Sequence, residues 1–295
     1  MALLLVVVGA AAAAVCTLAW FAADSILVPS RRRSTRSPDD LGLPFEALAI
    51  PLRDGFELRG WWVPATSPRA TVILLHGFGS SREELLDHPP YLHDAGFDLL
   101  LYDARACGES GGTMSTLGWR EQDDLRAVID LVEHRTAGRP IFAMGHSLGS
   151  ATIILEAAED DRMRAFVLEA PFTAIDEIVN RAFSHFTRPS LPAFPFAPVA
   201  VAIAEARVGR GPDSIRPIGS IGRLAPRQLL IVTGAHDEVV PPPDAARLAA
   251  AAGEGSTWWL VPDAGHSGSV DEPIVAAPSE YRRRVLDLFE RALEP

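Results

Sequence analysis

Short runs of apolar residues alternate with longer, helix-like segments along most of this chain. Each run is apolar throughout, which is typical of strands that are buried on both faces of a parallel sheet. A hairpin, 46–51 and 57–63 around the turn Asp54-Gly55, precedes the first run. The predicted buried strands are 70–75, 97–102, 140–144, 165–168, 228–233 and 257–261. The pattern predicts an α/β fold with a mostly parallel, doubly wound sheet and an N-terminal antiparallel hairpin.

The segments between the runs have the periodicity of amphipathic helices. In 119–135, for example, Leu125, Ile129 and Val132 share one face and charged residues occupy the other. The predicted helices are 83–94, 119–135, 148–158, 244–252 and 279–293. In a sheet wound in this way, ligands bind beyond the carboxyl ends of the strands, so we expect the functional residues at these ends.

One segment interrupts this alternation. Residues 172–226 lie between two predicted strands and are much longer than a crossover requires. The large apolar residues of this insertion are Phe183, Phe186, Leu191, Phe194 and Phe196. They fit either helices packed on the core or a lid over an apolar substrate pocket, and the sequence leaves both interpretations open.

The chain begins with an uncharged apolar segment, residues 2–23, which is long enough to cross a bilayer core of about 30 Å as a helix. A secretory signal would carry a basic start and a shorter apolar stretch, and a core helix would be amphipathic. Both alternatives stay open, but the pattern favours a membrane anchor. The predicted organisation is an anchor over 1–28, a linker over 29–44 and one folded α/β domain over 45–295, which includes the insertion 172–226.

Arginines follow the apolar segment, whereas no basic residue precedes it. Basic residues are enriched on the cytoplasmic side of membrane spans. The cluster of Arg31, Arg32, Arg33 and Arg36 therefore predicts a single-pass anchor in the cell membrane with the folded domain in the cytoplasm.

Composition excludes several classes of function. The formal net charge of −11 disfavours nucleic acid as a partner. All 27 basic residues are arginine, which excludes lysine Schiff bases and Ser-Lys dyads. Cys16 and Cys107 lie in an apolar segment and in a loop, so we expect no disulfide. No His, Cys and Asp residues have the spacing of metal ligands, and we expect neither a metal nor an organic cofactor.

The clearest chemical signal is the motif Gly145-His146-Ser147-Leu148-Gly149. It follows a predicted strand and opens a predicted helix, and in this context G-x-S-x-G indicates a nucleophilic serine on a sharp turn. Small residues two positions away on either side allow the turn, which exposes the hydroxyl above the sheet. Ser147 is therefore the candidate nucleophile, with a tight structural turn as the alternative.

A serine needs a base that is held in the right tautomer. His266 follows the last predicted strand on a glycine-rich loop, and Asp237 follows the strand before it. Asp263 is an alternative acid because it lies only three residues before His266. The chain order Ser, Asp, His favours Asp237. Four other histidines lie on helix-like stretches and are expected at the surface, namely His88, His93, His134 and His185.

Two backbone amides are expected to form the oxyanion hole. Leu148 follows the nucleophile and starts a helix, whose positive end favours developing negative charge. The second amide is expected from the loop after the strand 70–75, where Gly77 lets the backbone approach closely and Phe78 supplies the N–H. His76 is expected to brace this loop rather than to act as a second base.

These motifs together resemble the α/β-hydrolase superfamily, and they occur in family order over most of 45–293. The loop from Asp103 to Ser110 is similar to the family pattern D-x-R-G-x-G-x-S, with Ala106 in place of the first glycine. An apolar N-terminal segment before such a domain resembles the membrane-tethered branch that includes Bem46-like serine hydrolases. The resemblance implies an α/β-hydrolase fold, a Ser-His-Asp triad and no cofactor.

The expected reaction is the hydrolysis of a small-molecule acyl ester or thioester through an acyl-enzyme. A serine peptidase or an acyltransferase would use the same triad, because a fold does not determine a substrate. A catalytically silent scaffold on the same fold is a further alternative, although all three triad members are present. The apolar N-terminus and the phenylalanine-bearing insertion favour lipidic or thioester-linked acyl groups.

Overall fold

We describe a computed structural model of the chain over residues 1–187, 190–211, 214–266 and 273–294. A single eight-stranded sheet runs through the domain in the order β1-β2-β4-β3-β5-β6-β7-β8. The strands are β1 (Glu46–Pro51), β2 (Glu57–Val63), β3 (Ala70–Leu75), β4 (Phe97–Tyr102), β5 (Ile141–His146), β6 (Met163–Glu169), β7 (Gln228–Gly234) and β8 (Ser256–Val261). The pairs β1–β2 and β2–β4 are antiparallel and all the other pairs are parallel. This is the α/β-hydrolase fold that the sequence predicts.

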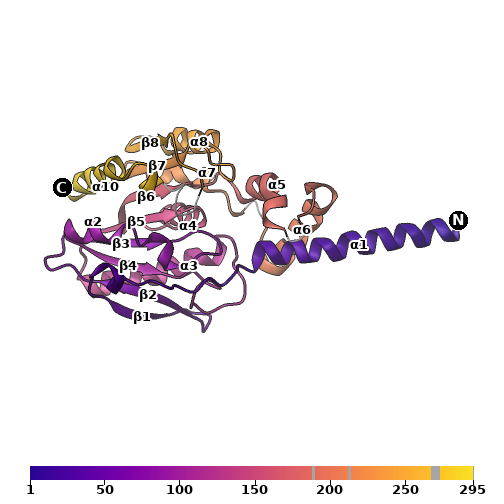
Figure 1. Ribbon diagram of the computed structural model, residues 1–295, viewed down its shortest axis with the longest axis horizontal. Coiled ribbons are helices and arrows are strands. Elements are labelled where there is room, and N and C mark those ends of the chain that lie inside the picture. The colour runs from indigo at the N-terminus through magenta and orange to yellow at the C-terminus, as the bar shows by residue number, and fades with distance from the viewer. Residues whose placement is uncertain (188–189, 212–213, 267–272, 295) are drawn as a thin grey trace.

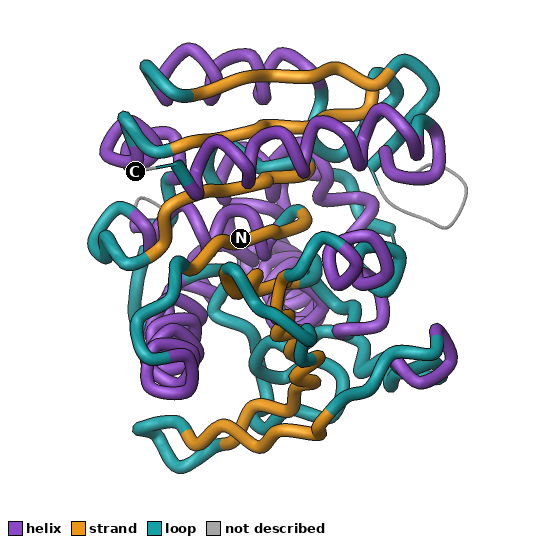
Figure 2. Tube along the Cα trace, turned by 90° about the vertical axis from the view of Figure 1, so that its left-hand side faces the viewer, coloured by secondary structure: helices purple, strands orange, loops and turns teal. Residues whose placement is uncertain are grey.

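Helices cover both faces of the strongly twisted sheet (Figure 1 and Figure 2). The α-helices are α1 (Ala2–Leu27), α2 (Pro89–Asp94), α3 (Trp119–Thr136), α4 (Leu148–Ala157), α5 (Ile175–Phe186), α6 (Ala193–Val208), α7 (Pro217–Ser220), α8 (Pro242–Ala252), α9 (Pro273–Ala276) and α10 (Pro278–Leu293). Short 3-10 turns are η1 (Pro38–Leu41), η2 (Arg82–Leu85) and η4 (Ile221–Leu224).

The two faces of the sheet bury different helices because side chains alternate along each strand. On β3, Ile73 and Leu75 pack in a cluster with residues of α3, α4 and α8. Val72 and Leu74 point to the opposite face and pack with residues of α2 and α10, including Phe289. Both clusters are almost fully buried. The sheet therefore forms a rigid base for the loops at its carboxyl edge.

The predicted helix 83–94 is wrong as one continuous element. The structure has the 3-10 turn η2 and then the short helix α2, which starts at Pro89. Proline lacks the N–H that a helix interior needs, and it disfavours helical backbone in the preceding residue. Pro89 and Pro90 therefore separate the two turns. The strand predicted at 140–144 is shifted instead, because β5 starts at Ile141 and continues to His146.

Helix α1 projects from the domain, and the N-terminus lies at its far tip (Figure 1). It is the one helix among the described residues that is long and apolar enough to cross a membrane, with a mean hydropathy of 2.6 over its best window. Its last turns are different, because Ala19, Ala22, Ala23 and Ile26 are buried against other helices. The helix is therefore exposed for most of its length and docked at its C-terminal end.

The chain after α1 lies against the domain rather than hanging free. Arg31 donates a hydrogen bond to the carbonyl oxygen of Ser110 at 2.7 Å and another to that of Gly112. Further along, the Thr35 hydroxyl bonds the Glu83 carboxylate at 3.0 Å. The segment predicted as a linker thus fixes the end of α1 relative to the sheet.

The insertion 172–226 folds into α5, α6, α7 and η4, apart from positions 188–189 and 212–213, which lie outside the described residues. Phe183 is fully buried in a third apolar cluster, whereas the Phe194 side chain is 82% exposed. The same cluster contains the end of α1 and Leu148. The insertion therefore connects the docked end of α1 with the residue that follows the candidate nucleophile.

Candidate active site

Ser147 lies at the turn between β5 and α4 with a backbone conformation of φ 49° and ψ −110°. A positive φ is unfavourable for a residue with a Cβ, and such conformations persist mainly at functional sites. The turn is held by hydrogen bonds, since the Ser147 N–H donates to the Glu169 carbonyl oxygen at 2.9 Å. The side chain of Ser150 donates to the Gly145 carbonyl oxygen at 2.6 Å. Ser147 is half-buried at the carboxyl edge of the sheet.

The two glycines of the motif are required by close backbone contacts. A Cβ at Gly149 would lie 2.1 Å from the carbonyl oxygen of Leu75, and a Cβ at Gly145 would lie 2.6 Å from the Ser150 nitrogen. The close approach of Gly149 to Leu75 places the start of α4 against the end of β3. The loop that carries Phe78, the second candidate amide, comes directly after β3.

Substituting Gly149 with alanine is expected to lower the free energy of unfolding by about 3 kcal/mol or more, the upper end of the usual overpacking cost. The clash is with main chain on both sides, so no side chain can move to relieve it. Urea unfolding of the intact chain measures the change through the midpoint. Gly219→Ala is the matched control, because a Cβ there has no atom within 4 Å. Equal midpoints for the two variants would contradict this account of the turn.

His266 and Asp237 come together at the same edge. The Nδ1 atom of His266 lies 2.8 Å from Oδ2 of Asp237. The Asp237 side chain is fully buried, and its Oδ1 accepts the backbone N–H groups of Val239 at 3.0 Å and Val240 at 2.7 Å. An ionised carboxylate makes Nδ1–H the donor and leaves Nε2 free as a base. Asp263, the alternative acid, is exposed.

A buried ion pair lies beneath His266. His146 bonds the Glu84 carboxylate through Nδ1, and its Nε2 donates to the carbonyl oxygen of His266 at 2.8 Å. Burial alone would lower the pKa of His146, but the charge of Glu84 raises it above its ordinary value. Burial alone would raise the pKa of Glu84, but the charge of His146 lowers it. The pair is therefore charged at neutral pH and holds the main chain of the candidate base.

A second set of buried polar residues, around Glu169, supports the turn at Ser147. Glu169, whose carbonyl oxygen accepts from Ser147, has its carboxylate bonded by the Tyr281 hydroxyl. His88 lies 3.7 Å from the same carboxylate and bonds the Tyr91 hydroxyl at 3.0 Å. Burial lowers the pKa of His88 to about 3 and raises that of Glu169.

The prediction that His88 lies at the surface is wrong, because only 2% of this residue is exposed. Two of its partners are distant in the chain and could not be inferred from local helix periodicity. They are Glu169 of β6 and the Tyr281 ring of α10, whose centroid lies 5.5 Å from that of the imidazole. His134 is exposed as predicted and His93 is half-buried. The side chain of His185 lies outside the described residues. Ser267, which follows the candidate base, also lies outside them.

The loop with the second candidate amide is braced by the loop after β4. The N–H of Ala104 donates to Nε2 of His76 at 2.9 Å, so the ring proton is on Nδ1 and is donated to the Gly77 carbonyl oxygen at 2.7 Å. A Cβ at Gly77 would lie 2.9 Å from Nδ1 of His146. These contacts connect the Phe78 loop directly to the serine turn, and Phe78 itself is half-buried.

The loop after β4 keeps its turn although alanine replaces a glycine. Ala106 has a φ of 60°, in the left-handed region that glycine adopts more easily, and its N–H bonds the Gly111 carbonyl oxygen at 2.8 Å. The buried Asp103 carboxylate accepts the backbone N–H of Arg82 at 2.7 Å. Cys107 is also buried, and burial raises its pKa to about 12, which makes the thiol unreactive.

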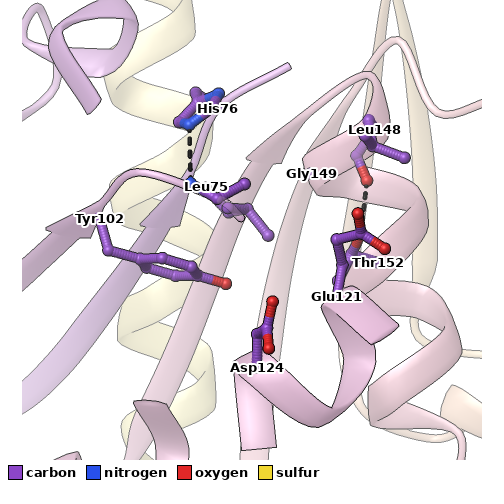
Figure 3. Close-up of a pocket in the computed structure, with 9 residues that line it drawn as sticks. Leu75, His76, Tyr102, Glu121, Asp124, Leu148, Gly149 and Thr152 are labelled. Carbon is purple, nitrogen blue, oxygen red and sulfur yellow. Dashed lines mark hydrogen bonds between the residues drawn. The ribbon is translucent and has the colours of Figure 1, made fainter. Parts of the chain in front are cut away.

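Figure 3 shows the space between the His76 loop and the start of α4. Leu75 and Leu148 line it from above, and the Tyr102 and Asp124 side chains point into it from below. The cavity volume is only about 10 Å³, which is room for about one water molecule. This cavity is therefore too small to hold a substrate.

The chain is similar to known hydrolases. A family model described as serine aminopeptidase, S33, matches residues 66–219, which is more than half of the chain. The YqkD protein of Bacillus subtilis is 28% identical over 221 residues, which cover 71% of this chain and 70% of that protein. The lysophosphatidylserine lipase ABHD12 of Macaca fascicularis is 31% identical over 124 residues, 40% of this chain and 31% of its own length.

Solved structures share the whole fold. An esterase of Pyrococcus furiosus, Pf2001, superposes with a TM-score of 0.74 and 25% identity, over 89% of this chain and 97% of that structure. Esterase and lipase relatives support a hydrolytic enzyme. The chain is a hydrolase with the α/β-hydrolase fold and belongs to the serine aminopeptidase S33 family.

Proposed function

We propose that the protein is a serine hydrolase that cleaves ester-type acyl bonds, with Ser147 as nucleophile, His266 as base and Asp237 as the acid that orients it. The observation that carries the proposal is the 2.8 Å contact of His266 Nδ1 with the buried Asp237 carboxylate, at the same sheet edge as the strained turn of Ser147. An orienting acid, a base and a serine hydroxyl are what acyl transfer through an acyl-enzyme requires.

In the first half of the reaction, the Ser147 oxygen attacks the carbonyl carbon while its proton passes to Nε2 of His266. The carbonyl oxygen becomes an oxyanion, which the N–H groups of Phe78 and Leu148 stabilise. The C–O bond to the leaving group then breaks, and the imidazolium protonates the departing alcohol. Water attacks the acyl-enzyme in the second half, His266 takes its proton, and that proton returns to Ser147 as the acid leaves.

The surroundings of the serine support an uncharged acyl group as substrate. Leu148, Phe172 and Val240 belong to one buried apolar cluster, against which Phe78 packs. An aminopeptidase needs a carboxylate for the substrate's ammonium group. One carboxylate of the insertion and one of α8 are already paired, since Glu177 bonds Arg247 at 2.7 Å and Asp244 bonds Arg181 at 2.6 Å. These pairs favour ester or thioester cleavage over aminopeptidase activity.

Helix α1 supports a membrane location for this activity. We propose that it is a single-pass anchor and that the catalytic domain is cytoplasmic, because the arginines at 31–33 and 36 follow the helix. Trp20 and Phe21 are exposed near the end of the apolar stretch, where aromatic side chains are enriched at the membrane surface. A reporter fused after Arg36 that is active only outside the cytoplasm would contradict the orientation.

The substrate class is tested with the purified full-length chain and a panel of p-nitrophenyl esters, a thioester and an aminoacyl p-nitroanilide. We expect higher kcat/KM for the esters and the thioester than for the anilide. An anilide that is the best substrate would reverse the assignment in favour of peptidase activity. No turnover of any member, together with no labelling by a fluorophosphonate probe, would support a silent scaffold.

A further inference from the structure

Helix α6 crosses the last turns of α1 at close range. Alanines pack at the crossing: Ala19, Ala22 and Ala23 of α1 and Ala197 and Ala200 of α6 are all buried in one cluster. Small residues of this kind allow helices to approach closely, as they do in membrane proteins. Figure 1 shows α5 and α6 on the side of the domain from which α1 projects.

The contact between α1 and α6 begins within the part of α1 that would cross the bilayer. A hydrocarbon core of about 30 Å takes about 20 helical residues. Counted from Ala2, such a span ends near Phe21 and therefore includes Ala19, which α6 covers. The Asp24 carboxylate, just beyond the span, pairs with Arg207 of α6 at 3.0 Å. Arg207 also lies over the Trp20 ring, 5.4 Å from its centroid.

The outward face of α6 carries no charge. Three of its exposed residues, Pro198, Ala202 and Ala206, follow each other at intervals of four, which places them on one side of the helix. Ala193 and Phe194 are exposed at its start, where the backbone of Phe194 is not helical. The charged residues of α6, Glu205 and Arg207, are half-buried on other sides of the helix. An exposed aromatic residue at the start of an uncharged helix face is typical of segments that enter a bilayer surface.

We propose that α6 is a second membrane-contacting element, whose exposed face, led by Phe194, enters the lipid interface beside α1. This inference rests on the proposed role of α1 as an anchor. The partner is the lipid bilayer itself, because α6 packs on the last turns of α1, and the preceding residues of α1 are apolar and exposed.

The contact would bring the lipid phase next to the catalytic edge. An apolar cleft between α1, α5 and α6 is lined by Leu27, Val179, Val201 and Ile215, among others. Ile215 and Leu148 both lie within 4 Å of the position of a Cβ at Gly118. The residue after the proposed nucleophile is therefore one side chain away from the cleft, so an acyl chain in the adjacent cytoplasmic leaflet would have a short apolar route to Ser147.

Site-specific fluorescence in vesicles tests the proposal. The full-length chain is reconstituted in phosphatidylcholine vesicles and labelled on a single cysteine with an environment-sensitive dye. Cys107 does not interfere, because it is 2% exposed and unreactive. The dye is placed at Cys16 within α1, at Phe194→Cys or at Phe56→Cys, the last two in a Cys16→Ser background. Phe56, 41% exposed on the β1–β2 turn, is the matched control.

Lipids that carry a nitroxide on the acyl chain then serve as quenchers. We expect the dyes at positions 16 and 194 to lose more than half of their emission, and the dye at position 56 to keep its emission. Unquenched emission at 194 with quenching at 16 would overturn the role of α6 and leave the anchor intact. Unquenched emission at both would overturn the anchor as well. If Phe194→Cys does not fold, Ala202→Cys on the same face gives the same test.

Discussion

Replacing Ser147 with alanine is expected to reduce the turnover of every ester that the intact chain cleaves by at least about 10⁴-fold. The hydroxyl supplies the electron pair that forms the acyl-enzyme, and no neighbouring side chain can replace it at the same point of the turn. Labelling by a fluorophosphonate probe should vanish at the same time, because the probe reacts with the same oxygen. The backbone should be unaffected, since alanine is smaller than serine.

Ser279→Ala is the control, because this serine is exposed at the start of α10 and takes no part in the proposed triad. Its labelling and its kcat should equal those of the unmodified chain. Labelling that persists in Ser147→Ala would mean that another nucleophile reacts with the probe. Turnover that persists without labelling would mean that the hydrolysis does not proceed through an acyl-enzyme on this serine.

Replacing Asp237 with asparagine is expected to lower kcat by about 10⁴-fold while KM changes little. The buried carboxylate can only accept a hydrogen bond, and it therefore fixes the proton of His266 on Nδ1. An amide can instead donate to Nδ1, which moves the ring proton to Nε2 and blocks the base. Val239 and Val240, whose N–H groups bond Oδ1, can keep their contacts with the amide oxygen.

The matched variant is Asp263→Asn, which tests the alternative acid three residues before His266. Because Asp263 is exposed, its replacement should leave kcat within about twofold of the unmodified chain, as is usual for surface substitutions. Both variants are assayed on one short, soluble ester, so that membrane binding does not affect the comparison. A large loss in Asp263→Asn with little change in Asp237→Asn would reverse the assignment of the acid.

Much of this fold could be predicted because its signals are local. A strand that is buried on both faces has to be apolar throughout, so β3 and β4 have the bounds that the apolar runs predict. Positions 145 and 149 are glycine because close backbone contacts leave no room for a Cβ, so this part of the turn is visible in the sequence. Chain order alone separated Asp237 from Asp263, and the contact of Asp237 with His266 agrees with that choice.

The remaining features depend on partners that are distant in the chain. The contact between Glu84 and His146 joins residues 62 positions apart, and neither side chain has a local pattern that indicates it. The same holds for His88, which is buried through contacts with β6 and α10. The helix break before Pro89 was visible in the sequence, because two consecutive prolines are a strong breaker.

The chain between α1 and β1 determines how the enzyme can search for substrate. A flexible tether would let the domain sample a volume that grows with tether length. Arg31 and Thr35 instead bond the domain. With α1 as the proposed anchor, the proposed catalytic edge would be held at one height and one tilt, and encounters with a lipid substrate would become two-dimensional. Turnover should depend on the mole fraction of substrate within the bilayer and on lateral diffusion, and diluting the vesicles in buffer should leave it unchanged.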